Sequence, residues 1–186
     1  MEKLLKKHHR LEEYNVVIRD MLRRGTLRIL TQEERDKWQG VINYVSHHMV
    51  LKSSSLSTPL RVVSNSSLDN NNTGHNYNAC LLKGPSSLTP LLEVLTTFRS
   101  YLNVLIYDLT KAYNSIFITM IHQHLRRLVW RWGDTNADWT VFCLARVMFG
   151  DRPAGLILEL VKALARELGV DICKRTCIQM EKGQYV

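Results

Sequence analysis

Residues 102–113, LNVLIYDLTKAY, contain an apolar run that ends on a single acidic residue, Asp108. Residues 104–107 are β-branched, aromatic or leucine, and the segment before them has a different periodicity, so we expect a buried strand. A carboxylate at the end of a buried strand is costly unless something binds it, and a divalent cation is one common solution. Asp108 is therefore a candidate metal ligand, with Lys111 and Tyr113 close behind it. The alternative is an aspartate that caps the next turn.

The length and composition suit a soluble globular chain with a real core. The chain has 186 residues, of which 45% are hydrophobic, enough for one domain or slightly more. It has no run of 18 apolar residues, so we expect no membrane span. Its first ten residues are charged throughout and lack an apolar signal core. We expect a cytoplasmic or nuclear protein that is not secreted and whose four cysteines are reduced.

The positive charge suggests a polyanionic partner. The formal net charge is +8 and the isoelectric point is near 9.5, a balance often found in proteins that bind nucleic acid. The charge is clustered in residues 3–10, 19–28 and 126–131, and Trp130 and Trp132 alternate with the last cluster. That alternation is compatible with a surface that follows a nucleic-acid backbone. Solvated helix faces explain the first two clusters about equally well.

Local patterns predict the elements of the N-terminal part. Helical periodicity covers residues 2–24, and Gly25 is expected to end that helix. Residues 27–30 are a candidate extended segment. The sequence TQEE at 31–34 fits an N-cap followed by acids in the first turn of another helix.

The rest of the chain mixes strand and helix patterns. Residues 44–50 and 60–64 have strand patterns joined by a polar link, which predicts a hairpin. The later elements are expected in this order: a loop at 65–78, an amphipathic helix at 88–101 with Leu91, Leu92, Leu95 and Phe98 inside, the strand at 104–107, an extended segment at 114–119, a short helix at 122–128, a strand-like segment at 139–149 and a helix at 153–168. This mixture predicts an α+β fold.

Several short motifs follow one another in a fixed order. They are YVSHHMV (44–50), Lys52, TPLRVVSNSS (58–67), NACLLKGP (78–85), Arg99, DLTKAY (108–113) and FGDRPAG (149–155). The series resembles the reverse transcriptase of long-terminal-repeat retrotransposons, most closely the Bel/Pao group, over about residues 10–186. The resemblance implies a partial right-hand polymerase. A helical N-terminal region would span 1–43, and the fingers with an incomplete palm would span 44–186.

The resemblance also implies roles for individual residues. Asp108 matches the first catalytic carboxylate, which would hold two Mg²⁺ ions together with the carbonyl of Leu109. Tyr113 matches the aromatic steric gate that excludes a ribose 2′-hydroxyl. The full nucleotide-binding set is Lys52, Arg61, Leu109, Thr110, Lys111, Ala112, Tyr113, Phe149 and Gly150. These residue types suit the task, because arginine forks onto phosphate oxygens, lysine acts as a point charge and magnesium prefers hard oxygen ligands.

The implied activity is RNA-directed DNA synthesis. Two-metal nucleotidyl transfer would extend a primer on an RNA/DNA template with deoxynucleoside triphosphates. The family carries two further aspartates directly after a Tyr-x dipeptide, and this chain ends on Tyr185-Val186. We therefore expect a fragment that does not polymerise as it stands, from a polyprotein that continues into thumb and ribonuclease H regions.

The register of one motif and the function of the chain each leave alternatives open. The family's proline lies further beyond the Phe-Gly pair than Pro153 does here, so the register of residues 149–155 is open by a residue or two. The competing functions are a non-catalytic nucleic-acid-binding remnant of a retroelement polymerase and a helical interaction module.

Overall fold

The computed structural model describes the chain except residues 52–59, 70–73, 87–88, 105, 107–108 and 183–186, and it leaves the side chains of 169–182 undescribed. The fold is α+β, as the sequence predicts. Its elements are α1 (Glu2–Lys7), α2 (Leu11–Arg23), β1 (Leu27–Ile29), α3 (Gln32–Lys37), β2 (Ser46–Leu51), β3 (Leu60–Asn65), η1 (Tyr77–Cys80), α4 (Leu91–Arg99), η2 (Tyr113–Ser115), α5 (Met120–Gln123), η3 (His124–Arg126), β4 (Arg127–Trp130), β5 (Thr140–Leu144) and α6 (Ala154–Lys182).

The chain divides into two compact units. The first unit comprises Met1–Leu81 and Tyr113–Asp151, and the second comprises Leu82–Ala112 and Arg152–Val186. The N-terminal helices thus share a unit with both sheets. None of the helices in the described ranges combines the length and the apolarity that crossing a membrane requires.

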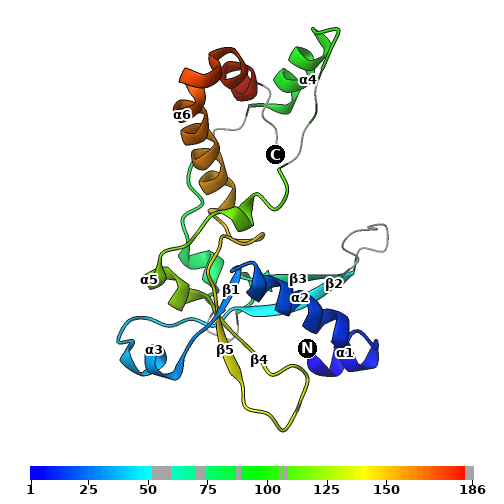
Figure 1. Ribbon diagram of the computed structural model, residues 1–186, viewed down its shortest axis with the longest axis vertical. Coiled ribbons are helices and arrows are strands. Elements are labelled where there is room, and N and C mark those ends of the chain that lie inside the picture. The colour runs from blue at the N-terminus through cyan, green and yellow to red at the C-terminus, as the bar shows by residue number, and fades with distance from the viewer. Residues whose placement is uncertain (52–59, 70–73, 87–88, 105, 107–108, 183–186) are drawn as a thin grey trace. The chain divides into compact units, whose positions relative to one another are not determined.

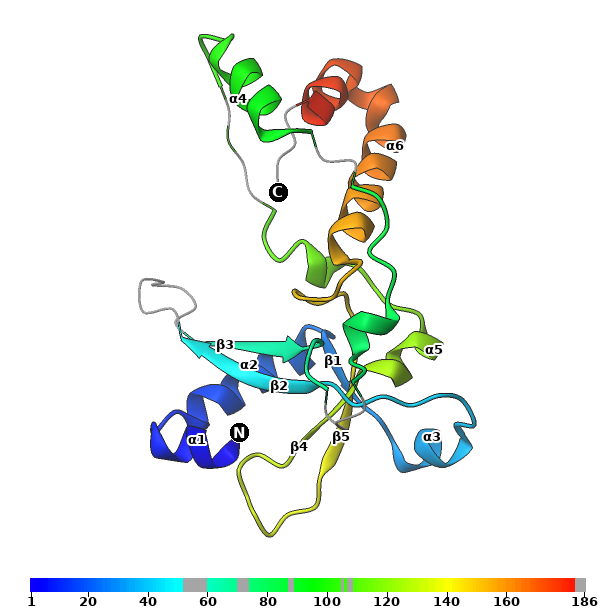
Figure 2. The same ribbon diagram turned by 180° about the vertical axis from the view of Figure 1, so that it is seen from behind.

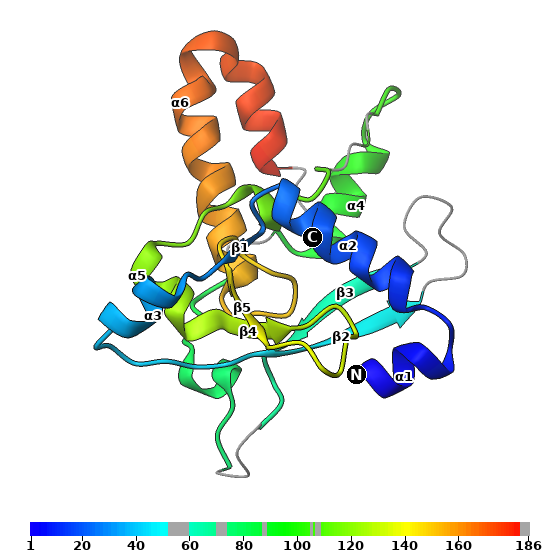
Figure 3. The ribbon, with the colours of Figure 1, turned by 60° about the horizontal axis from the view of Figure 1, so that its bottom comes forward.

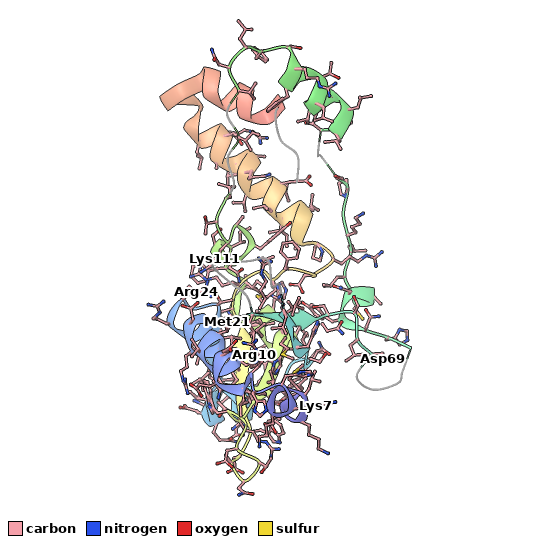
Figure 4. All side chains as sticks on the ribbon, turned by 90° about the vertical axis from the view of Figure 1, so that its right-hand side faces the viewer. Lys7, Arg10, Met21, Arg24, Asp69 and Lys111 are labelled. Carbon is pink, nitrogen blue, oxygen red and sulfur yellow. The ribbon has the colours of Figure 1, made fainter. Side chains whose placement is uncertain are left out.

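The helix expected over residues 2–24 is broken into α1 and α2. The break falls at His9, whose φ of 53° lies outside the helical region. The predicted end at Gly25 is confirmed: its φ is 68°, and its N–H bonds the carbonyl of Leu22 while Thr26 N–H bonds that of Met21. This is the pair of bonds of a Schellman motif, which favours glycine at the left-handed position. Figure 4 labels Arg10, Met21 and Arg24 along this part of the chain.

The expected N-cap of α3 is confirmed. Thr31 Oγ1 accepts a hydrogen bond from Glu34 N–H, and the Glu34 carboxylate accepts one from Thr31 N–H. This reciprocal capping box satisfies donors that the first helical turn leaves free.

The predicted hairpin is confirmed as the antiparallel pair β2–β3. Its register pairs Ser46 with Asn65 and Leu51 with Leu60. Helix α2 covers one face of the hairpin: it passes in front of the strands in Figure 1, and the strands lie in front of it in Figure 2. Leu60 and Val62 belong to the core on this face, so Arg61, between them, points to the opposite face.

A second sheet has the strand order β1-β5-β4, with both pairings antiparallel (Figure 3). Strands near residues 27–30 and 139–149 were expected. The helix expected over 122–128 was wrong at its C-terminal end, because the helical turns stop at Arg126 and Arg127–Trp130 forms β4. A short apolar run such as Leu128-Val129-Trp130 suits a helix or a strand equally by periodicity, and pairing with β5 decides between them.

The core of the first unit lies between α1, α2, the hairpin and the second sheet. Its fully or almost fully buried side chains are Leu5, Tyr14, Ile18, Met21, Leu27, Leu60, Leu128, Trp130, Phe142, Leu144 and Met148. Asn15 is a polar side chain buried with them: it accepts a hydrogen bond from the Trp130 indole (2.9 Å) and donates one to the carbonyl of Trp132 (3.1 Å). The bonds tie α2 to the end of β4.

In the second unit the expected helices are present as α4 and α6. The expectation that α4 has an inward apolar face was wrong, because all four of its proposed inward side chains are exposed: Leu91, Leu92, Leu95 and Phe98. The buried strand expected over 104–107 was wrong for Val104 and Ile106, which lie outside any strand and are 44% and 81% exposed. Strand propensity needs a partner strand to take effect, and no described strand pairs with these two residues.

Candidate functional site

The proposed site residues fall in both units. Asp108 and Lys52 lie outside the described residues, so their roles stay predictions. Residues 109–112 belong to the second unit. The first unit holds the other four: Arg61, Tyr113, Phe149 and Gly150.

Tyr113 and Phe149 are in contact. Their ring centroids are 5.1 Å apart and the planes meet at 87°, an edge-to-face arrangement that aromatic rings prefer. Phe149 is otherwise open to solvent, with 72% of its surface exposed. The structure therefore brings together two side chains that the motif series assigns separately to one pocket.

Backbone pairing explains why these rings meet. The chain after Tyr113 runs antiparallel to the segment before Phe149, with a bridge between Phe117 and Arg146. Ile118 N–H bonds the carbonyl of Ala145 (2.9 Å), and Val147 N–H bonds that of Ile116 (3.0 Å). Tyr113 lies four residues before Phe117 and Gly150 lies four residues after Arg146, so this register brings Tyr113 level with the turn that contains Phe149.

The turn that carries Phe149 lies against the end of the hairpin. Gly150 has a φ of 94°, and a Cβ added there would lie 3.8 Å from the carbonyl oxygen of Ser64 on β3. The Gly150 carbonyl accepts a hydrogen bond from Asn78 Nδ2 (2.8 Å), which also donates to Ser67 Oγ (2.9 Å). Gly150 thus holds a backbone position that a side chain would strain.

Arg61 lies on the same strand, β3, as Ser64. Its side chain is exposed on the hairpin face away from α2, next to its cross-strand neighbour Val50, which is also exposed. Within the described residues its guanidinium makes no ion pair. A guanidinium carries five N–H donors, and their planar arrangement suits the oxygens of a phosphate group.

The turn at residues 109–112 is exposed at three of its positions. Ala112 N–H bonds the carbonyl of Leu109 at 3.3 Å, and Lys111 has a φ of 54°. A carbonyl oxygen has two lone pairs, so this bond leaves Leu109 able to ligate a cation. The side chains of Thr110 and Lys111 make no contact with another described residue that would prevent them from binding a ligand.

The donor set that the resemblance implies fits magnesium in type. A carboxylate at Asp108 and the carbonyl of Leu109 are hard oxygen ligands of the kind that Mg²⁺ takes. Among the described residues, no three histidine, cysteine or acidic side chains gather into a metal-binding group. Asp108 is outside that set, so the two-magnesium site stays a prediction.

Sequence reasoning missed a buried ionic cluster beside the turn. Arg126 pairs with Asp151, and Ser66 Oγ donates to the same carboxylate at 2.8 Å. Tyr77 lies near both charges: burial raises the pKa of its phenol, the Asp151 charge raises it further and the Arg126 charge opposes the shift. The only available signal was the acidic residue directly after Phe149-Gly150.

The proposed basic surface around residues 126–131 is corrected by this burial. Arg126 and Arg127 are buried, Trp130 is a core residue, and Arg131 pairs with Glu2 and lies over the Trp139 ring. These arginines are buried or bind other groups of the protein itself, so they do not form a surface that follows a nucleic-acid backbone.

Much of the N-terminal positive charge is also paired. Acidic side chains form ion pairs with Arg10, Arg19, Arg23, Arg24 and Arg28, and Arg23 and Arg24 share Asp20. Lys3, Lys6 and Lys7 have no ion-pair partner in the part of the chain that the structure describes.

Comparison of the chain with family models, with curated proteins and with solved structures gives no match. The resemblance to a known family therefore stays a prediction from the ordered motifs.

Proposed function

We propose that the chain is a fragment of an RNA-directed DNA polymerase of the Bel/Pao reverse-transcriptase type, with β2–β3 as its fingers hairpin and an incomplete palm. The observation that carries this proposal is the ring contact between Tyr113 and Phe149. The motif series assigns the first residue to the deoxyribose gate and the second to the nucleotide pocket. Such an enzyme would act in the cytoplasm or nucleus.

Arg61 would contribute a phosphate-binding side chain to this pocket. Its strand reaches Ser64, beside the Gly150 turn, and its guanidinium is exposed. In the proposed reaction Arg61 and Lys52 bind the triphosphate, while the Tyr113 ring lies against the sugar. Asp108 and Leu109 would hold magnesium, which supplies charge stabilisation at the transferring phosphoryl group.

Binding of deoxyguanosine triphosphate tests the proposal without requiring polymerisation. Isothermal titration calorimetry of the 186-residue chain with this nucleotide and magnesium should show binding that depends on Arg61. Loss of a charge-assisted hydrogen bond costs about 1.5–3 kcal/mol, so Arg61→Ala should weaken binding roughly 10- to 100-fold. Arg23→Ala removes the same charge from the exposed surface of α2 and is the matched control. Equal affinity in the two variants would contradict the proposal.

The steric gate gives a second, independent measurement. The wild-type chain should bind deoxyguanosine triphosphate more tightly than guanosine triphosphate, and Tyr113→Val should reduce that preference by admitting the 2′-hydroxyl. Asp108→Asn should remove the magnesium dependence, because an amide is a far poorer ligand than a carboxylate. Salt-sensitive binding of a primer-template duplex with no nucleotide binding would favour the non-catalytic remnant instead.

A further inference from the structure

The Arg126–Asp151 pair joins three segments that are distant in the sequence. Arg126 ends η3, Ser66 follows β3, and Asp151 closes the turn that contains Phe149. Arg126 is 1% exposed and Asp151 is 9% exposed. The guanidinium pairs with one carboxylate oxygen and also donates to the carbonyl of Arg146 (2.8 Å). Ser66 Oγ donates to the other carboxylate oxygen (2.8 Å).

A buried ion pair is a poor way to gain stability. Removing two charges from water is costly, and well-packed apolar side chains of similar volume often do as well or better. What the pair provides is a fixed geometry, because a buried network in which one carboxylate accepts from both Arg126 and Ser66 favours one arrangement of the segments it joins. Here that arrangement fixes the residue next to Gly150.

Beyond Met148, whose side chain is buried in the core where the turn begins, the turn has few apolar contacts. Phe149 is 72% exposed, so packing around its side chain is sparse apart from the Tyr113 ring. Gly150 has no side chain and adopts a left-handed conformation. The anchors are therefore polar: the Asn78 bond to the Gly150 carbonyl, and the buried bonds of Asp151.

We infer that Arg126 and Asp151 are positioning residues that fix the turn after Met148 and so hold the Phe149 ring against Tyr113. The geometric part of this inference stands by itself. The functional part, that the held ring forms a wall of a nucleotide pocket, rests on the proposed function.

Aromatic NMR of the full chain tests the geometry directly. In the wild type, ring protons of Tyr113 and Phe149 should show a nuclear Overhauser effect, since the centroids are 5.1 Å apart. Asp151→Asn keeps the size of the side chain but removes its charge, and should abolish this effect. Ser66→Ala removes one bond to the carboxylate and should reduce the effect at least twofold.

A destabilising change elsewhere separates positioning from general stability. Tyr14→Phe breaks the bond from Tyr14 to His47 in the core of the same unit and should leave the Tyr113–Phe149 effect unchanged. An undiminished effect in Asp151→Asn would overturn the inference. If Asp151→Asn does not fold, Ser66→Ala decides in its place, and an undiminished effect there overturns the inference equally.

Titration with deoxyguanosine triphosphate and magnesium distinguishes this inference from the proposed function. If both hold, Asp151→Asn loses the ring contact and binds the nucleotide at least fivefold more weakly than the wild type. A wild type that binds no nucleotide, with a ring contact that is still lost in the variant, would leave positioning supported and refute the pocket. A wild type that binds nucleotide, with a ring contact that persists in the variant, would refute positioning and leave the pocket supported.

Discussion

Replacing Asn15 with leucine should destabilise the first unit by about 2–4 kcal/mol. Asn15 is 4% exposed, and it bonds both the Trp130 indole and the Trp132 carbonyl. Leucine has a similar volume, so the change removes both bonds without opening a large cavity. Each buried polar group left without a partner costs about 1–3 kcal/mol, or about 2–6 kcal/mol for the two. Burial of the leucine methyl groups recovers part of that loss.

Urea unfolding followed by tryptophan fluorescence measures this loss. All four tryptophans belong to the first unit: Trp38, Trp130, Trp132 and Trp139. With a slope of about 2 kcal/mol per molar urea, a loss of about 3 kcal/mol lowers the midpoint by about 1.5 M. Val16→Ala, at an exposed position of the same helix, is the control and should change stability by less than about 0.5 kcal/mol. A leucine variant no less stable than this control would refute the reasoning.

The remaining predictions concern His47 and Gly25. His47 Nε2 donates to the Val129 carbonyl (3.1 Å), so Nδ1 of the neutral ring accepts from Tyr14, and burial lowers the pKa of the ring. The unfolded chain then binds a proton more readily, so stability should fall as the pH drops below about 6.5, by at most about 1.4 kcal/mol per pH unit for this group. Urea midpoints between pH 7.5 and 5 measure this loss of stability. Subtracting the curve of His47→Gln from that of the wild type separates the effect of His47 from that of His124, whose pKa shifts in the same direction. Parallel curves for the two proteins would contradict the assignment. Gly25→Ala should cost about 1–2 kcal/mol, because alanine is strained at a φ of 68° although the site has room for a Cβ. Thermal melts that show no loss for Gly25→Ala would count against the Schellman cap.

Elements whose signals are local were predictable from the sequence. The β2–β3 hairpin follows from two strand patterns and a polar link. Gly25 predicts where α2 stops, and Thr31 predicts where α3 starts. The break at His9 was not predictable, because the apolar stripe continues across it.

Features that depend on distant partners were not predictable. Arg126 and Arg127 were interpreted as exposed, as charged residues usually are, but Arg126 finds its partner 25 residues further along the chain. The apolar side of α4 predicts burial only if some element covers it, and local periodicity cannot tell whether one does. The ring contact between Tyr113 and Phe149 arises from a backbone register that neither motif contains.

The pairing of β1 with β5 has a consequence for the order of folding. Ile29 pairs with Phe142, which closes a loop of 112 residues (30–141), whereas the hairpin closes a link of eight (52–59). Loop-closure entropy grows with the logarithm of length, and this ratio adds about 2 kcal/mol to the barrier for the longer loop. The hairpin should therefore form early, and the N-terminal strand should pair later, because its partner Phe142 lies 113 residues beyond Ile29 in the chain. Pulse-labelled hydrogen exchange during refolding should accordingly protect amides of β2 and β3 before those of β1.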